Sequence, residues 1–415
     1  MAHKSILVVG GGVSGITAAI EASEAGSEVY LVEQKSYLGG KVAQIYQYFP
    51  KLCPPNCGLE INFKRIKQNP KISIFTLAEV ETIEGKEGDF TVTVKSNASR
   101  VNQNCTACGK CAEVCPVERS NEFNYGLDNT KAIYKAHEFA FPMKYSIDDK
   151  VCLGAECGKC VEACKYDAIE LDMATKSLKL NVGAIIWATG WDAYDASKVA
   201  YYGYSQHQNV ITNVIMERLA APNGPTRGKI VRPSDGKAVE SIAFVQCAGS
   251  RDENHLAYCS GVCCMASLKQ ATYVKEQNPD AKVYMFYIDV RAMGKHEDFY
   301  TKVQNELTLI KGKVGEITED PITKDLTVLV ENQVTGEIMK DKFDMVVLAT
   351  GMVPATAGLK LPVELSYDED GFIATDSKQP GIYGAGCVKK PMDVASSVKD
   401  ATAAALKAIQ STVRR

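Results

Sequence analysis

Fourteen of the fifteen cysteines of this 415-residue chain fall into four short clusters, and this clustering constrains its fold more than any other feature. A dense set of cysteines can indicate an extracellular disulfide scaffold. The opening MAHKSILVVGGG has no secretory signal, so we expect a cytoplasmic, reducing location. In that setting, clustered cysteines indicate metal binding or redox chemistry.

Two of the clusters have the spacing of iron–sulfur ligands. The first run reads C-x2-C-x2-C-x3-C-P, and the second reads C-x4-C-x2-C-x3-C. This pattern is typical of bacterial ferredoxins with two [4Fe–4S] clusters, in which the fourth cysteine of each run binds the other cluster. We therefore assign one cluster to Cys105, Cys108, Cys111 and Cys164, and the other to Cys152, Cys157, Cys160 and Cys115. Zinc is the alternative, because C-x2-C pairs also form zinc knuckles.

A glycine-rich turn follows the first predicted strand. In SILVVGGGVSGITAAIEASEAGSEVYLVEQ, Gly10, Gly12 and Gly15 form G-x-G-x-x-G between a strand and a helix, and Glu33 ends the second strand. Such glycines let the backbone approach a pyrophosphate at a helix N-terminus, and the acidic residue binds a ribose hydroxyl. The turn therefore predicts a dinucleotide site, with a purely structural turn as the alternative.

Three further segments favour FAD as that dinucleotide. AIIWATG (184–190) and MVVLATG (345–351) are predicted strands, and GIYGAGC (381–387) precedes a helix predicted from about Asp393 to Val413. Together with LGGK (38–41), they resemble the flavoproteins with two dinucleotide-binding domains, the thioredoxin reductase and glutathione reductase class. That resemblance implies an α/β fold with FAD on the first glycine-rich turn.

The same resemblance implies the FAD contacts. They are Gly10, Gly12, Val13, Ser14, Gly15, Glu33, Gln34, Gly39, Gly40, Lys41, Val80, Ala188, Thr189, Gly190, Gly386, Cys387, Asp393 and Val394. The class usually has an aspartate where this chain has Cys387. A small buried residue beside the flavin is therefore the alternative role for Cys387.

The predicted domains interrupt one another along the chain. The FAD-binding domain is expected in three parts, 1–99, 176–191 and 352–415. A ferredoxin domain of the α+β class (100–175) is inserted between two strands of its β-meander, GDFTVTVKSN and SLKLNVGAIIWATG. An NAD(P)-like domain (192–351) is expected from SIAFVQ, MASLKQATYVKEQ and AKVYMFYID, which read as strand, helix and strand.

The NAD(P)-like domain has no phosphate-binding loop. Where glycines would be needed, the sequence has AGSRDENHLAY and then CSGVCC, so we expect no NAD(P)H site. We predict instead a third [4Fe–4S] cluster at the helix N-terminus, whose positive end favours a negative cluster. Its ligands would be Cys247, Cys259, Cys263 and Cys264. Structural cysteines and a strained Cys263–Cys264 disulfide are the alternatives.

Several segments closely resemble the flavoprotein of heterodisulfide reductases, known as their A subunit. They are QCAGSRDE, YCSGVCCMASLKQA, YIDVRAMGKHEDFY and KAIYKAHEFAFPMKYSIDDKVC. The resemblance implies an unconventional cluster near FAD on the same four cysteines. The chain is shorter than those flavoproteins, without their extra N-terminal cluster domain and C-terminal ferredoxin extension. It therefore looks like the corresponding flavoprotein of the quinone-interacting membrane-bound oxidoreductase (Qmo) complex of sulfate reducers.

That resemblance implies a set of partners. They are a second heterodisulfide-reductase-A-like flavoprotein, a haem b and iron–sulfur subunit that interacts with quinone, and adenylylsulfate reductase. The chain itself contains no apolar run of the ~18 residues that a membrane span needs. We thus expect peripheral attachment to the inner membrane through partners. A net charge of -3 gives no support for nucleic-acid binding.

Cys53 and Cys57 form the fourth cluster, C-x3-C. Pro54, Pro55 and Asn56 between them predict a loop rather than a helix, and structural thiols are the preferred interpretation. A flavin-coupled redox dithiol is the alternative. The sequence thus favours an electron-transfer subunit. Its alternatives are an independent disulfide reductase using these two cysteines, a protein that bifurcates electrons at the flavin, and a degenerate structural protein.

Overall fold

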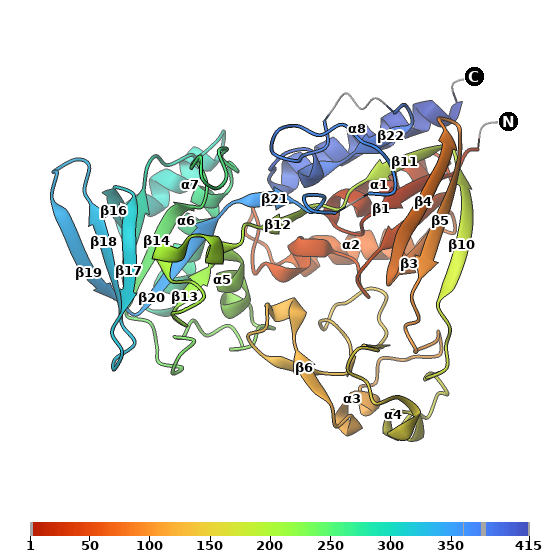
Figure 1. The fold of residues 1–415 in the computed structure, drawn as a ribbon, viewed down its shortest axis with the longest axis horizontal. Coiled ribbons are helices and arrows are strands. Elements are labelled where there is room, and N and C mark those ends of the chain that lie inside the picture. The colour runs from red at the N-terminus through yellow and green to blue at the C-terminus, as the bar shows by residue number, and fades with distance from the viewer. Residues whose placement is uncertain (1–2, 360, 375–378, 414–415) are drawn as a thin grey trace. The chain divides into compact units, whose positions relative to one another are not determined.

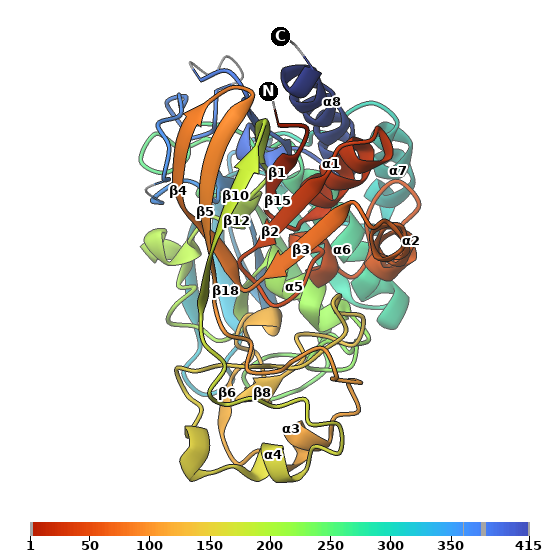
Figure 2. The ribbon, with the colours of Figure 1, turned by 90° about the vertical axis from the view of Figure 1, so that its right-hand side faces the viewer.

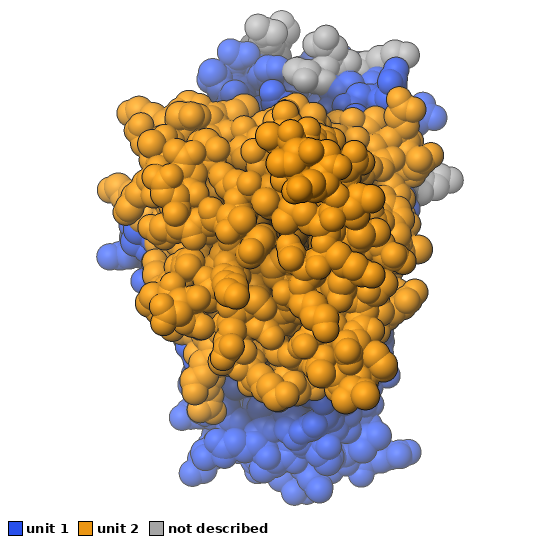
Figure 3. All heavy atoms as spheres, turned by 90° about the vertical axis from the view of Figure 1, so that its left-hand side faces the viewer, with its two compact units in different colours: residues 1–44, 53–191, 354–415 blue, residues 45–52, 192–353 orange. Residues whose placement is uncertain are grey.

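The computed structural model describes residues 3–359, 361–374 and 379–413. The chain divides into two compact units, 1–44 with 53–191 and 354–415, and 45–52 with 192–353 (Figure 3). The fold of each unit is shown in Figure 1. Among the described helices, none is long and apolar enough to cross a membrane.

The first unit is built on a five-stranded parallel sheet. Its order is β22 (Ile382–Gly384), β11 (Ala184–Trp187), β1 (Ile6–Val9), β2 (Val29–Glu33) and β3 (Ile72–Thr76). The central strands are continuous apolar runs because both faces of a parallel sheet are covered. Ile6 and Val8 pack in the core that includes helices α1 (Val13–Glu24) and α8 (Val394–Val413).

The opposite face of this sheet is covered by a three-stranded antiparallel sheet (Figure 2). Leu7 and Val9 pack with Phe90 and Val92 of that second sheet. Its order is β10 (Lys176–Val182), β5 (Asp89–Ser96) and β4 (Ala78–Lys86). Because β5 and β10 are adjacent in the sheet but far apart in the sequence, residues 97–175 form an insertion between neighbouring strands.

The insertion consists of short elements. They are α3 (Lys110–Val114), β6 (Glu118–Ser120), β7 (Asn129–Lys131), β8 (Ile133–Tyr134), β9 (Ser146–Ile147) and α4 (Lys159–Glu162). It packs on the predicted FAD-binding part of the same unit. The Leu38 N–H donates to Phe141 O over 2.8 Å, and the Gln44 side chain donates to Phe123 O over 2.9 Å. Phe141 also stacks on Phe63 of α2 (Pro55–Gln68), with ring centroids 5.0 Å apart.

The second unit has the same layers. Its parallel sheet has the order β13 (Val210–Thr212), β20 (Met345–Thr350), β14 (Ser241–Ala248), β15 (Lys282–Tyr287) and β16 (Thr308–Lys311). Its helices are α5 (Asn213–Ala220), α6 (Cys263–Gln277) and α7 (His296–Val303). An antiparallel sheet of β17 (Val314–Glu319), β18 (Leu326–Glu331) and β19 (Ile338–Phe343) packs on one face. The short strands β12 (Trp191–Ala193) and β21 (Met352–Pro354) pair with each other.

A short segment, 45–52, belongs to the second unit, although it lies inside the range 1–99 predicted for the FAD-binding domain. A buried ion pair holds it there. The Tyr46 N–H donates to Glu217 over 2.9 Å, and Glu217 pairs with Lys269 of α6 over 3.0 Å. The Lys269 ammonium also donates to Gln47 O.

Candidate functional site

The glycine-rich turn is closed so tightly that only glycine fits at positions 10 and 15. Gly10 has φ +105, and a Cβ there would lie 2.4 Å from Ala188 O. A Cβ at Gly15 would lie 1.8 Å from Gly10 O. Gly12 is the N-cap of α1, and no side chain caps its orphan N–H groups. The N-terminus of α1 therefore keeps its N–H groups available for an anion such as a pyrophosphate.

Two other predicted FAD segments converge on this turn. The Gly39 N–H donates to Gly11 O over 2.8 Å, and a Cβ at Gly40 would lie 2.9 Å from Gly12 Cα. A Cβ at Gly386 would lie 2.1 Å from Ser14 Oγ, since 386–387 also approaches the start of α1. The structure thus brings together residues 10–15, 38–41, 188–190 and 386–387.

Two side chains at this turn bear on ligand binding. The Glu33 carboxylate accepts the Gly11 N–H over 2.6 Å and the Lys35 N–H over 2.7 Å. Burial raises the pKa of Glu33 against the opposing effect of these bonds. Thr189 Oγ1 is buried without a hydrogen-bond partner. A buried hydroxyl of this kind costs free energy unless a ligand or water meets it, so the residues fit a bound dinucleotide.

Of the remaining predicted FAD contacts, Asp393 and Cys387 form hydrogen bonds within the chain. The Asp393 carboxylate accepts the Ser396 N–H over 2.6 Å, immediately before Val394 begins α8. The buried Cys387 thiol donates to Met392 O over 3.5 Å, and burial raises its pKa. Val80 is half-buried on β4, and Gln34 is exposed after β2.

Asp400 is a residue that the sequence did not reveal. Its carboxylate accepts the Gly386 N–H over 2.8 Å and pairs with Lys389 over 2.7 Å. It therefore bonds the backbone of the segment in which the resembled class carries its aspartate. It lies 14 residues beyond Gly386, in the second turn of α8, so no local motif marks it.

Lys41 lies where the insertion meets the predicted FAD loop. Its ammonium lies 5.5 Å from the ring centre of Tyr125 and 6.0 Å from that of Trp191. The Tyr125 hydroxyl donates to Gln44 over 3.3 Å, so the insertion contributes an aromatic wall beside LGGK.

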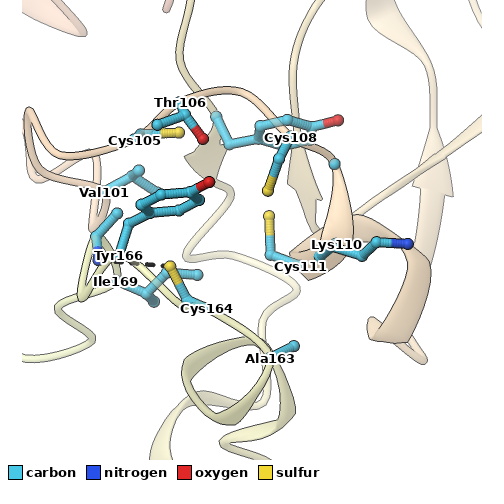
Figure 4. Close-up of a pocket in the computed structure, with 13 residues that line it drawn as sticks. Val101, Cys105, Thr106, Cys108, Lys110, Cys111, Ala163, Cys164, Tyr166 and Ile169 are labelled. Atoms are coloured by element: carbon cyan, nitrogen blue, oxygen red, sulfur yellow. Dashed lines mark hydrogen bonds between the residues drawn. The ribbon is translucent and has the colours of Figure 1, made fainter.

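A pocket in the insertion is lined by the cysteines assigned to the first cluster, Cys105, Cys108, Cys111 and Cys164 (Figure 4). Cys164 therefore joins the other three although it comes from the second run. Backbone N–H groups of Ala107 and Ala168 donate to Cys105 and Cys164 over 3.4 Å each. Burial, with the nearby Cys105 and Cys108, raises the pKa of Cys111 to about 12. Four thiols sharing one pocket, with N–H donors to sulfur, fit an iron–sulfur cluster.

The second run repeats this local geometry. Gly109 and Gly158 have φ +87 and +54, and each precedes a short helix whose second residue is a cysteine. Burial, and then Cys152 and Cys115, raises the pKa of Cys160, so these three thiols lie near one another. The Gly154 N–H donates to Cys152 over 3.4 Å. Cys157 follows the 154–156 turn and is half-buried.

The cysteines of the second unit gather at one edge of its parallel sheet. Cys247, with φ +55, is the penultimate residue of β14, and Cys263 and Cys264 begin α6. Burial, and then Cys264 and Cys259, raises the pKa of Cys247 to about 11, so these thiols are close together. Burial also raises the pKa of Cys263, with contributions from the other three cysteines. Cys259 accepts the Gly261 N–H over 3.3 Å.

This edge is the carboxyl end of parallel strands, where doubly wound sheets bind their ligands. The Cys263 thiol donates to Thr350 O of β20 over 3.4 Å, and that of Cys264 to Asp289 O after β15 over 3.7 Å. All fifteen cysteines are free, so no Cys263–Cys264 disulfide is formed. In the described ranges, no group of three or more His, Cys, Asp or Glu side chains is placed closely enough to hold a single metal ion.

The prediction of a loop around Cys53 and Cys57 is wrong for Cys57. Helix α2 begins at Pro55, so Cys57 lies in its first turn. Proline is accepted at the first helical position, because its fixed φ suits a helix and its missing N–H would have no helical partner there. Cys53 is half-buried and Cys57 is exposed.

Comparison with known proteins defines the class. A family described as FAD dependent oxidoreductase matches residues 5–51, which contain the glycine-rich turn. The fold is similar to that of thioredoxin reductase from T. acidophilum, with a TM-score of 0.55 at 16% identity over 99% of this chain and 100% of that one. The chain thus has the predicted thioredoxin-reductase-like α/β fold, and its glycine-rich turn is similar to that of FAD-dependent oxidoreductases.

Curated relatives narrow this class. The chain is 40% identical over 97% of its length to the iron-sulfur A subunit of the CoB–CoM heterodisulfide reductase of Methanocaldococcus jannaschii. It is 38% identical over 97% of its length to the A subunit of the H(2):CoB-CoM heterodisulfide,ferredoxin reductase of Methanothermobacter thermautotrophicus. Over almost all of its length the chain is similar to these A subunits, which supports the predicted resemblance at this level. The chain spans 63% of the length of each of these two relatives.

Proposed function

We propose that this chain is an electron-transfer subunit of a larger oxidoreductase complex, with FAD and two [4Fe–4S] clusters in its first unit and a third cluster in its second unit. When bound, FAD would exchange two electrons and each cluster one. The observation that carries this proposal is the grouping of cysteines. One set shares a pocket that spans both ferredoxin-like runs, and another gathers at the sheet edge of the second unit.

The chain's own residues would hold FAD in the usual way of this fold. The N-terminus of α1 would face the pyrophosphate, with Gly10 and Gly15 allowing its close approach. Glu33, at the end of β2, would bind a ribose hydroxyl, and the buried Thr189 Oγ1 has no hydrogen-bond partner within the described chain. The contacts of Gln44 with Phe123 and Tyr125 fix the insertion against the loop that contains Lys41. This packing supports a fixed spacing between the flavin and the insertion's clusters.

The alternative of a nicotinamide-dependent disulfide reductase has less support. The first turn of α6 contains Cys263 and Cys264 instead of the glycines that NAD(P)H needs. Cys57 is exposed at the start of α2, and no contact between it and Cys53 is found among the described residues.

For the particular complex, we propose the quinone-interacting oxidoreductase of sulfate respiration. In it the chain would relay electrons between adenylylsulfate reductase and a haem b membrane protein, beside a second flavoprotein of the same type. The names of the relatives favour a second candidate, a heterodisulfide reductase assembly. In that assembly the chain would bifurcate electrons at its flavin.

Two measurements test these proposals. Anaerobically purified chain should contain one FAD and about twelve iron atoms, whereas about eight would remove the third cluster. Affinity purification from the native cells then identifies the complex. A co-purifying haem b protein supports the quinone complex, a disulfide-reducing partner supports the second candidate, and a chain that purifies alone contradicts both.

A further inference from the structure

Two arginines border the four cysteines of the second unit. Arg251 lies in the loop after β14, and Arg291 lies four residues beyond the end of β15. Both pair with one carboxylate, that of Asp289. Arg251 contacts it through Nη1, and Arg291 approaches it with Nε 3.5 Å from Oδ1. The three residues therefore form one charged group with a net charge of about +1.

This charged group lies against the cysteines. The Cys264 thiol donates to the Asp289 carbonyl over 3.7 Å, so the residue with which both arginines pair also contacts a proposed cluster ligand. Arg251 belongs to the turn that follows Cys247, in which the Ser250 N–H donates to Cys247 O over 3.1 Å.

The place of this group in the fold is informative. In a nicotinamide-binding domain, the residue just beyond the second strand is an acid that binds a ribose hydroxyl. Asp289 occupies that place after β15, but its carboxylate forms ion pairs with two arginines. The edge that would have bound a dinucleotide instead brings positive charge, held by Asp289, beside the four cysteines.

We infer that Arg251 and Arg291, positioned by Asp289, raise the reduction potential of the cluster at Cys247, Cys259, Cys263 and Cys264. This inference rests on the proposed third cluster. Reduction adds one electron to a group that is already negative, so nearby positive charges and N–H donors stabilise the reduced form. The Arg251 side chain is 25% exposed and that of Arg291 44% exposed. Solvent screens the more exposed charge more strongly, so Arg251 has the larger effect.

The test is a potentiometric titration of the whole, anaerobically purified protein, followed by electron paramagnetic resonance. We expect Arg251→Gln to lower the equilibrium constant for reduction of one cluster about tenfold, a shift of about 59 mV to more negative potential. Arg291→Gln should give a smaller shift that shrinks further at high salt. Arg251→Lys should restore most of the potential, and the other two clusters should not shift in any variant.

Arg227→Gln is the matched control, since Arg227 is an exposed arginine in a turn of the same unit. Its midpoint potentials should equal those of the unmodified protein. Unchanged potentials in both Arg251→Gln and Arg291→Gln, with about twelve irons retained, would overturn the arginine role alone. About eight irons in the unmodified protein would instead overturn the third cluster, and this inference with it. If Arg251→Gln loses iron, the more exposed Arg291→Gln still decides the question.

Discussion

Replacing Lys269 by methionine should loosen segment 45–52 from the second unit. The Lys269 and Glu217 side chains are 6% and 5% exposed and their charged atoms lie 3.0 Å apart. At an effective dielectric constant of ~20, their attraction is about 5–6 kcal/mol before desolvation is subtracted. Removing one partner of a buried pair leaves the other charge uncompensated, which typically costs about 3–5 kcal/mol. The Glu217 carboxylate would then be drawn toward solvent, away from the Tyr46 N–H that it accepts.

Native-state hydrogen exchange measures this directly at the Tyr46 amide. A local loss of about 3 kcal/mol corresponds to an exchange rate at least about 100-fold faster. Lys275→Met on the same helix is the control, because the Lys275 bond to Pro279 O lies at the surface, and it should change stability by less than about 0.5 kcal/mol. The double variant with Glu217→Gln should be more stable than the sum of the single changes by about 1–3 kcal/mol. Unaltered Tyr46 protection in Lys269→Met would refute the reasoning.

Three further predictions concern the cofactors. Gly15→Ala should yield protein without flavin, because its Cβ would lie 1.8 Å from Gly10 O, while Gly315→Ala, whose nearest atom is 3.8 Å away, should keep its flavin absorbance. Cys160→Ser should lose up to about four irons from the insertion, and Cys263→Ser up to about four from the second unit. If either variant keeps the iron content of the unmodified chain, the assignment of that cysteine as a ligand is contradicted. NADH and NADPH should not bleach the flavin in stopped-flow mixing, whereas a chemical reductant should, and rapid bleaching by either nucleotide would show that a nicotinamide site remains.

Features set by local sequence could be predicted. The strands at 6–9, 184–187 and 345–350 are continuous apolar runs because they are buried on both faces. A run of that kind can be recognised in the sequence alone. The turn at Gly10 to Gly15 and the cysteine spacings of the insertion are local as well. The gathering of Cys164 with the first run followed from the spacing rule for ferredoxins.

Features that depend on pairing between distant strands could not be predicted. Arg251 and Arg291 meet only because β14 and β15 are neighbours, so their loops open at the same edge. Segment 45–52 belongs to the second unit because Tyr46 bonds to the buried Glu217–Lys269 ion pair. Both residues of that pair lie more than 170 residues farther along the chain. The start of α2 at Pro55 was misjudged because proline was treated as a helix breaker rather than as an N-terminal residue.

The pairing of β5 with β10 also bears on how this chain could have been assembled. Ser96 and Lys176 stand opposite each other in the ladder, so both ends of the insertion leave from one point on the sheet. A tight turn of about two to five residues would join them with little strain, since that is how most adjacent antiparallel strands are connected. An insertion at such a hairpin adds residues 97–175 without changing how β5 pairs with β10. The added segment therefore enters the chain at a point where the sheet tolerates extra length.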